Sequence, residues 1–351
     1  MTASAHPRPE RTHAAQPRPG SLWGDDPPHP PEGPSGLRLA VCAATIAACV
    51  PYLTIKIAWL SGSTVGWNDP SAAGDSALYA GNAITMAMDA VAVLVAMAFT
   101  FRWGRRAPAW LVLTPIWVAV GLLAPIVLAV PLGSLLQVLF SSEPLTADDN
   151  AIQGWVYAVV YSGFTLQGLG LLTAFVLYAR DRWPRVFTVR TGDVPKGATN
   201  PLQVLLARGA VVPAAAFAAT HLYWAFGGTA GLRADELENR NLGQQLADGV
   251  WGLLALAGAT ALVLIVQRVE RPGRFVAPLA VAWVGASATF AWSLYGLLVM
   301  LARPGFLASD VTAAAALTAL AGLLAGLVMG LTGAFMLAED QSARPTASST
   351  P

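Results

Sequence analysis

Three ionisable side chains lie inside long apolar stretches of this sequence, where a charge is expensive. Lys56 and His221 each occur near the end of such a stretch, and Asp89 occurs near the middle of another. An aspartate at the centre of a membrane helix costs about 2.5–3.5 kcal/mol on insertion scales, and such residues are functional candidates by default. These three side chains are therefore the first candidates for binding a ligand.

Lys56 and His221 occupy the same position in a motif that the sequence contains twice. The copies are Lys56-x-x-Trp59-x-x-Gly62-x-x-x-Gly66 and His221-x-x-Trp224-x-x-Gly227-x-x-x-Gly231. Residues three apart share a helix face, so each basic side chain could work together with its tryptophan. The structural alternatives are an aromatic belt at the membrane surface for the tryptophans, a lysine extended to lipid headgroups and a neutral histidine satisfied by a backbone carbonyl.

Asp89 is predicted to pair with Lys56, with His221 as the competing partner. Side chains tilt toward the N-terminus of their helix, and the first two membrane helices run in opposite directions. Lys56 and Asp89 are therefore expected to point toward each other, and a pair would remove the cost of a lone buried carboxylate. The residue equivalent to Asp89 in the second copy is Ala255. His221 is therefore either neutral or faces Asp89.

Three further polar residues complete the set of binding candidates. Asp248 lies about 30 Å from Arg268 at about 1.5 Å per residue, which places it at the outer end of its helix. A favourable interaction with the helix dipole is the alternative role for Asp248. Its counterpart in the first copy is Asn82, and both could line a vestibule. Gln167 is a second buried polar group, and its alternative role is to link helices by hydrogen bonding.

No recognisable enzyme constellation is present in the sequence. It has no pair of membrane histidines for haem or a metal, no paired carboxylates on one buried face, no phosphate-binding glycine loop and no Ser/His/Asp set with suitable spacing. We therefore predict no catalytic residues, no metal and no cofactor, and an enzyme is the less favoured class.

The composition identifies the kind of protein that must position these residues. Hydrophobic residues make up 55% of the 351-residue chain and charged residues only 12%, with a mean hydropathy of +0.54. Such a chain is too apolar for a soluble globule, so the lipid bilayer is its first partner. The net charge of +1 gives no reason to expect a nucleic-acid partner.

Eight apolar runs are long enough to cross a hydrocarbon core of about 30 Å, which takes about 20 residues. They predict an all-α polytopic membrane protein with transmembrane helices at 36–60, 79–101, 109–135, 153–179, 201–226, 246–267, 275–301 and 310–337. Ser35 before the first run, and Asn200 followed by Pro201 before the fifth, are helix N-cap signals.

The basic residues between the runs predict the orientation. Lys and Arg close to helix ends stay on the cytoplasmic side. They follow the second, fourth and sixth runs, at 102–106, 180–196 and 268–274, whereas the alternate connections are mainly acidic. Both termini are therefore expected in the cytoplasm, and the Trp–Gly motifs on the outer face of a multi-pass plasma-membrane protein.

The eight runs divide into two similar sets of four. The Trp–Gly motif recurs after 165 residues, and Trp117 recurs as Trp283 after 166. Because each set has an even number of helices, the sets form two parallel four-helix repeats, related by an axis along the membrane normal. The predicted organisation is a disordered cytoplasmic tail at 1–34, repeats at 35–185 and 200–340, a cytoplasmic linker at 186–199 and a disordered cytoplasmic tail at 341–351.

The second copy of the motif also carries a family resemblance. His221-Leu-Tyr-Trp224-Ala-Phe-Gly227-Gly228 resembles the signature of small, four-helix bacterial membrane proteins of unknown function, which have a His-x-Tyr-Trp-Ala-x-Gly-Gly segment in their first helix. In the first copy Lys56 replaces the histidine, and Ser61-Gly62-Ser63 departs from the glycine pair. The resemblance implies a tandem fusion of two such units, and it brings no activity with it.

Three functions remain open on these observations. The favoured one is binding or transport of a small molecule or ion through an outward-facing polar pocket between the repeats. The second is a membrane enzyme that acts on a lipid-soluble substrate at the same pocket. The third is a structural or partner-binding membrane protein in which the polar residues only lock the helices together.

Overall fold

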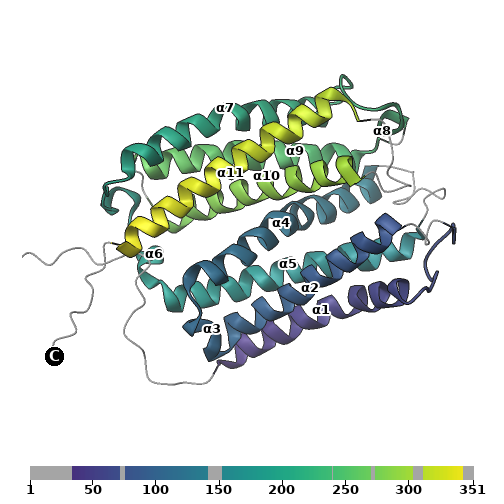
Figure 1. The fold of residues 1–351 in the computed structure, drawn as a ribbon, viewed down its shortest axis with the longest axis horizontal. Helices are drawn as coiled ribbons and strands as arrows, with labels where there is room; N and C mark the ends of the chain where they lie inside the picture. Colours follow the sequence, from purple (N-terminus) through teal and green to yellow (C-terminus); the bar gives the residue numbers. More distant parts are fainter. Residues whose placement is uncertain are drawn as a thin grey trace, which may run out of the picture.

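The chain folds into long α-helices that run alongside one another, as an all-α polytopic membrane protein (Figure 1). The computed structural model describes residues 34–71, 76–140, 152–238, 240–269, 273–302 and 311–342. Within these ranges, eight helices are long and apolar enough to cross a membrane. They are α1 (Gly36–Leu60), α2 (Ser76–Thr100), α4 (Ala109–Phe140), α5 (Gly154–Arg182), α7 (Asn200–Ala225), α9 (Leu242–Val266), α10 (Val276–Ala302) and α11 (Ala313–Ser342).

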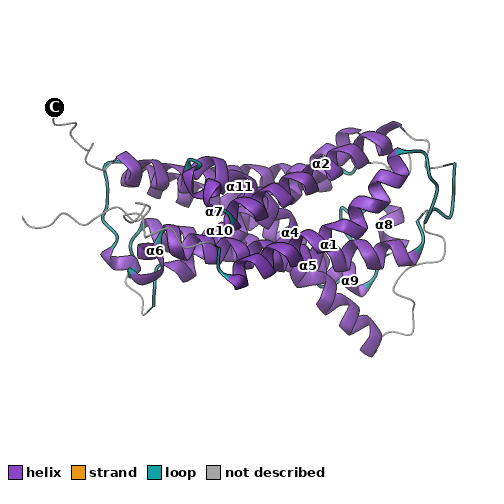
Figure 2. Ribbon diagram, turned by 90° about the horizontal axis from the view of Figure 1, so that it is seen from below, coloured by secondary structure: helices purple, strands orange, loops and turns teal. Residues whose placement is uncertain are grey.

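Short helices mark the two ends of the molecule. α3 (Arg102–Arg106) and α6 (Pro184–Thr188) lie at one end, and α8 (Ala234–Glu238) lies at the other (Figures 1 and 2). We call the end where α1 begins and α11 stops the terminal end. The opposite end is the Trp–Gly end, because the Trp–Gly motifs finish α1 and α7 there. Nearly all of the two predicted tails lies outside the described residues.

The eight predicted membrane helices are confirmed, and local capping explains where they start. The Ser35 hydroxyl accepts from the backbone N–H of Arg38 at 3.4 Å, as predicted. α9 starts four residues before the predicted 246, because Asn241 and Gln244 form a capping box. The prediction that Asn200 caps its helix is wrong. Its amide instead donates to the carbonyl of Val266 at 2.9 Å, one of the carbonyls left open at the end of α9.

The long helices form two groups of four (Figure 1). The first half comprises α1, α2, α4 and α5, and the second half comprises α7, α9, α10 and α11. In each half the first helix packs against the second and the fourth, and the third packs against the fourth. The halves meet mainly through α4, which packs against both α10 and α9.

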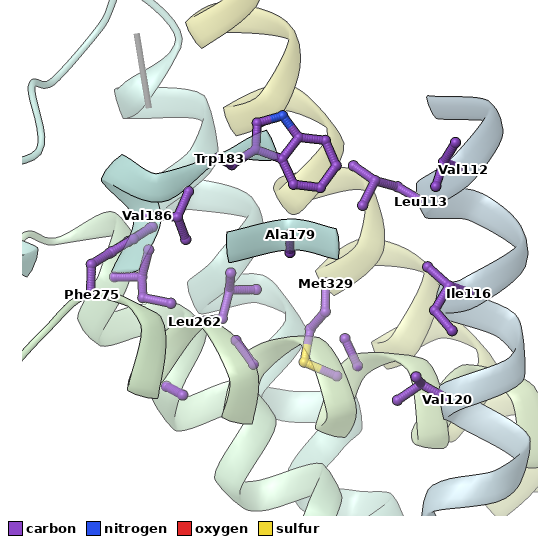
Figure 3. Close-up of a cluster of buried hydrophobic side chains, with 14 of the residues drawn as sticks. Val112, Leu113, Ile116, Val120, Ala179, Trp183, Val186, Leu262, Phe275 and Met329 are labelled. Carbon is purple, nitrogen blue, oxygen red and sulfur yellow. The ribbon is translucent and has the colours of Figure 1, made fainter. Parts of the chain in front are cut away.

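A continuous cluster of buried apolar side chains joins the halves (Figure 3). It includes Ile116 of α4, Ala179 of α5 and Leu262 of α9. Helices in lipid associate through close packing, which small residues permit. α4 and α10 approach so closely that a Cβ at Gly121 would lie 2.3 Å from the backbone oxygen of Ser287. The packing between the halves therefore depends on a glycine.

At the terminal end, each half links its first helix to its fourth by a polar contact. In the first half, Arg38 forms an ion pair with Asp181 at 2.5 Å. In the second half, the amide of Gln203 donates to Glu339 at 2.9 Å. Gln203 lies 165 residues after Arg38, and Glu339 lies 158 residues after Asp181. Equivalent positions in the two halves therefore make equivalent contacts.

Candidate functional site

The chain leaves α1 and α7 through turns of the same conformation. Gly62 and Gly66 have φ values of 89° and 79°, and Gly227 and Gly231 have 87° and 85°. Only glycine adopts these angles without steric cost. Each turn also contains the backbone hydrogen bond across five residues that defines a Schellman cap. The glycines of both motifs therefore end a helix and turn the chain.

The tryptophan of each motif fastens this turn. The indole N–H of Trp59 donates to the carbonyl of Val65 at 2.8 Å. The indole N–H of Trp224 donates to the carbonyl of Ala230 at 3.0 Å, again across six residues. Each tryptophan thus has a structural partner within its own turn, which the sequence motif alone did not reveal.

Lys56 is buried beside α2 and does not extend outward. Only 8% of it is exposed, and its Nζ donates to Oδ1 of Asn82 at 2.5 Å. The ammonium also lies over the rings of Tyr52 and Trp59, 5.0 and 5.1 Å from their centroids. Aromatic faces attract cations, most strongly where water is excluded. The headgroup alternative for Lys56 therefore does not hold.

Asp89 accepts a hydrogen bond from Gln167, and the predicted ion pair with Lys56 is wrong. Gln167 Nε2 donates to Oδ1 of Asp89 at 2.9 Å, and the other carboxylate oxygen, Oδ2, is buried with no hydrogen-bond partner among the described residues. Asn82 precedes Asp89 by seven residues, which is about 10 Å along the helix. The amide of Asn82 is therefore the group that Lys56 meets first, while Gln167 of α5 reaches Asp89.

His221 has an acidic partner, but it is Asp248 rather than Asp89. His221 Nδ1 lies 2.8 Å from Oδ1 of Asp248. Arg240 donates to the other oxygen, Oδ2, at 2.5 Å and to the backbone carbonyl of Trp224 at 2.8 Å. A carboxylate only accepts hydrogen bonds, so Nδ1 carries the proton in this contact and a neutral ring keeps its lone pair on Nε2.

The register of the two halves contained the signal for this pair. His221 follows Lys56 by 165 residues, and Asp248 follows Asn82 by 166. The contacts Lys56–Asn82 and His221–Asp248 are therefore made by equivalent positions. Arg240 was missed because it belongs to the connection before α9, whose path periodicity does not predict.

An aromatic cavity of about 370 Å³ opens beside His221 and Asp248 at the Trp–Gly end. Its aromatic lining consists of Phe217, Trp224, Trp251, Trp292 and Tyr295. All of the lining comes from the second half, whereas the sequence predicted a polar pocket between the repeats. Between the halves the described residues instead form an apolar cavity of about 110 Å³, lined by α4, α5, α6 and α10.

The aromatic cavity brings together two of the predicted residue pairs and leaves the others outside. His221, Trp224 and Asp248 line it. The remaining candidates, Lys56, Trp59, Asn82, Asp89 and Gln167, belong to the first half and are not part of its lining. The sequence analysis also missed Trp251 and Ser293, which lie on helices whose apolar faces toward lipid and toward protein look alike.

Three hydrogen-bonding groups of the cavity lining have no protein partner among the described residues. They are Nε of Arg240, Nε1 of Trp251 and Oγ of Ser293, and all three atoms are buried. A buried donor without a partner costs about 1–3 kcal/mol. By contrast, Nε1 of Trp292 donates to the carbonyl of Leu122 in α4 at 3.2 Å, which fixes this wall to the first half.

No family model, curated protein or solved structure matches this chain. Its function is inferred from the site alone. Within the described ranges, no three side chains of His, Cys, Asp or Glu are grouped so that they could hold a metal ion. What the site offers is an aromatic enclosure, a neutralised His–Asp–Arg cluster and buried donors directed at a ligand-sized space.

Proposed function

We propose that this integral membrane protein binds a small molecule in the aromatic cavity, as a binding or transport protein. The observation that carries the proposal is the set of buried polar atoms on Arg240, Trp251 and Ser293 that lack a protein partner. Natural proteins rarely leave such groups unsatisfied, so a ligand or water must complete their hydrogen bonds. Binding sites are typically apolar enclosures with a few placed polar groups, which is the composition of this cavity.

The Trp–Gly end faces the outside of the plasma membrane in this proposal, and both termini lie in the cytoplasm. Arginines cluster at the terminal end, after α2, α5 and α9. At the Trp–Gly end, Arg233 and Arg240 are compensated by ion pairs with Glu236 and Asp248. The excess of uncompensated basic residues at the terminal end therefore supports a cytoplasmic position for it.

The chain is also proposed to be a tandem duplication of one four-helix unit. The support is the agreement of contacts at a nearly constant offset: the tryptophan-fastened turns, the basic residue bonded to the second helix, and the polar link between the first and fourth helices. Gly66 and Gly231 add to it, because the carbonyl of each accepts from the residue just before the fourth helix or its first turn, Gln153 and Thr312 respectively.

Labelling of a single introduced cysteine tests the cavity and its orientation together. In a background with Cys42 and Cys49 replaced by alanine, Thr318→Cys is placed in the cavity wall, and Thr332→Cys lies fully buried on the same helix. A membrane-impermeant thiol reagent added to intact cells should modify Thr318→Cys but not Thr332→Cys. Failure to label Thr318→Cys from outside would favour a structural protein with a dry interior.

A further inference from the structure

The polar groups of the aromatic cavity define what its ligand must carry. The indole N–H of Trp251 and the Nε–H of Arg240 can only donate hydrogen bonds, and the Ser293 hydroxyl can donate one. The acceptors of the lining are already used. Both oxygens of Asp248 are bonded to His221 and Arg240, and Glu236 is bonded to Arg233. The ligand must therefore supply acceptor atoms.

The charges of the lining favour a neutral ligand. Arg240 is compensated by Asp248 at 2.5 Å, and Arg233 by Glu236 at 3.2 Å. A cationic ligand would find no carboxylate that lacks a partner, and an anionic ligand would have to compete with Asp248 for Arg240. Each would disturb a buried ion pair, which is costly once one partner loses its counter-charge.

The shape of the lining favours a planar ring. His221 and Trp251 have ring centroids 5.3 Å apart, Trp251 and Trp292 are 5.2 Å apart, and Trp292 and Tyr295 are 5.7 Å apart. These four rings form a continuous aromatic wall, and flat apolar faces bind planar molecules by stacking. Tyr295 closes this wall and is 48% exposed on a membrane-spanning helix, so the wall reaches the surface that lipid covers.

We infer that the ligand is a neutral, planar, lipid-soluble carbonyl compound of the quinone class, held by hydrogen bonds from Trp251 and Ser293 to its carbonyl oxygens. The inference rests on the proposed binding function and names its ligand class. It concerns binding only, because carbonyl oxygens are acceptors that match the three donors, and a quinone ring matches the aromatic wall.

The test uses purified full-length protein in lipid nanodiscs with decylubiquinone as the probe. Saturable binding is measured by titration, alongside a lipophilic cation, tetraphenylphosphonium, and a lipophilic anion, decanoate. Trp251→Phe keeps the ring but removes the donor, and it should raise the Kd for decylubiquinone about tenfold, the value of one hydrogen bond. Trp110→Phe changes an exposed tryptophan of α4 and should leave the Kd unchanged.

Ser293→Ala provides a second variant if Trp251→Phe does not fold, and it should also weaken decylubiquinone binding. Binding of tetraphenylphosphonium or decanoate without decylubiquinone would overturn the quinone class while leaving the binding function standing. If Thr318→Cys is labelled from outside but none of the three probes binds, the quinone class is likewise wrong. If the cysteine is not labelled and no probe binds, the proposed function itself fails.

Discussion

The two halves of the molecule place a basic side chain at the same point of their first helix and satisfy it differently. In the first half the cation of Lys56 meets a neutral amide, Asn82, and the nearest carboxylate is two turns further along α2, at Asp89. In the second half His221 meets the carboxylate of Asp248 directly. Shifting the acid by two turns thus changes the contact from a lysine–amide bond to a histidine–carboxylate pair.

The surroundings of the two contacts differ in the same direction. Lys56 is enclosed by aromatic rings, and the ring of Trp59 also packs on Trp67 at 5.3 Å between centroids. His221 instead faces the aromatic cavity. The comparison teaches that one helical frame can hold either a closed polar contact or an open site, depending on which residues occupy a few positions.

The largest expected effect is a difference in stability between the two contacts. Asp248→Ala leaves Arg240 and His221 buried without their carboxylate, and it should lower the free energy of unfolding by about 3–5 kcal/mol. Asn82→Ala removes one hydrogen bond to Lys56 and should cost about 1–3 kcal/mol. Titration of the purified protein with sodium dodecyl sulfate in mixed micelles measures both. Equal losses would mean that the contacts are energetically alike.

The next effect concerns the surface on which the halves meet. Gly121→Ala places a Cβ against the backbone of Ser287, so α4 and α10 must move apart, at a cost of about 1–3 kcal/mol. Gly209→Ala on α7 is the control, because no atom lies within 4 Å of the added Cβ. The same detergent titration should show a loss for Gly121→Ala only. An equal response from both variants would argue against close packing of the halves.

A smaller and equal effect is expected from the two motif tryptophans. Trp59→Phe and Trp224→Phe each remove one indole hydrogen bond to a turn carbonyl, worth about 1 kcal/mol. The two unfolding free energies should therefore fall by similar amounts. A loss confined to one variant would mean that the turns, despite their matching geometry, do not contribute equally to the halves.

The smallest effect is the coupling between Lys56 and Asp89. Because each residue has a different hydrogen-bond partner, Lys56→Met and Asp89→Asn should be additive within about 0.5 kcal/mol in a double-mutant cycle. Unfolding of the two single variants and of the double variant provides the measurement. A coupling energy above about 1 kcal/mol would restore the direct pair that the sequence predicted.

Much of the fold could be predicted from the sequence because lipid imposes a simple rule on length and polarity. Each of the eight apolar runs became a helix, and the glycines of the Trp–Gly motifs ended α1 and α7 as their type requires. The capping box at Asn241 was also readable, since Asn241 and Gln244 have the required spacing. These features depend on local sequence alone.

The site could be predicted only in part, because it depends on how helices are rotated against one another. In a membrane helix the residues facing lipid and those facing protein are equally apolar, so the sequence does not show that Trp251 and Ser293 face a cavity. Arg240 reaches Asp248 from a connecting segment whose path no periodicity describes. The partner of His221 was accessible through the register of Asn82 and Asp248, and the tilt of side chains was the weaker guide.

The most direct test of the account compares one position in the two halves. Ser293 of α10 lines the aromatic cavity, and its equivalent 166 residues earlier is Val127 of α4, which packs against Gly168. With Cys42 and Cys49 replaced by alanine, Ser293→Cys and Val127→Cys are treated in intact cells with a membrane-impermeant thiol reagent. The account predicts labelling of Ser293→Cys and none of Val127→Cys. Equal labelling, or labelling of Val127→Cys alone, would contradict the claim that the second half holds the open site.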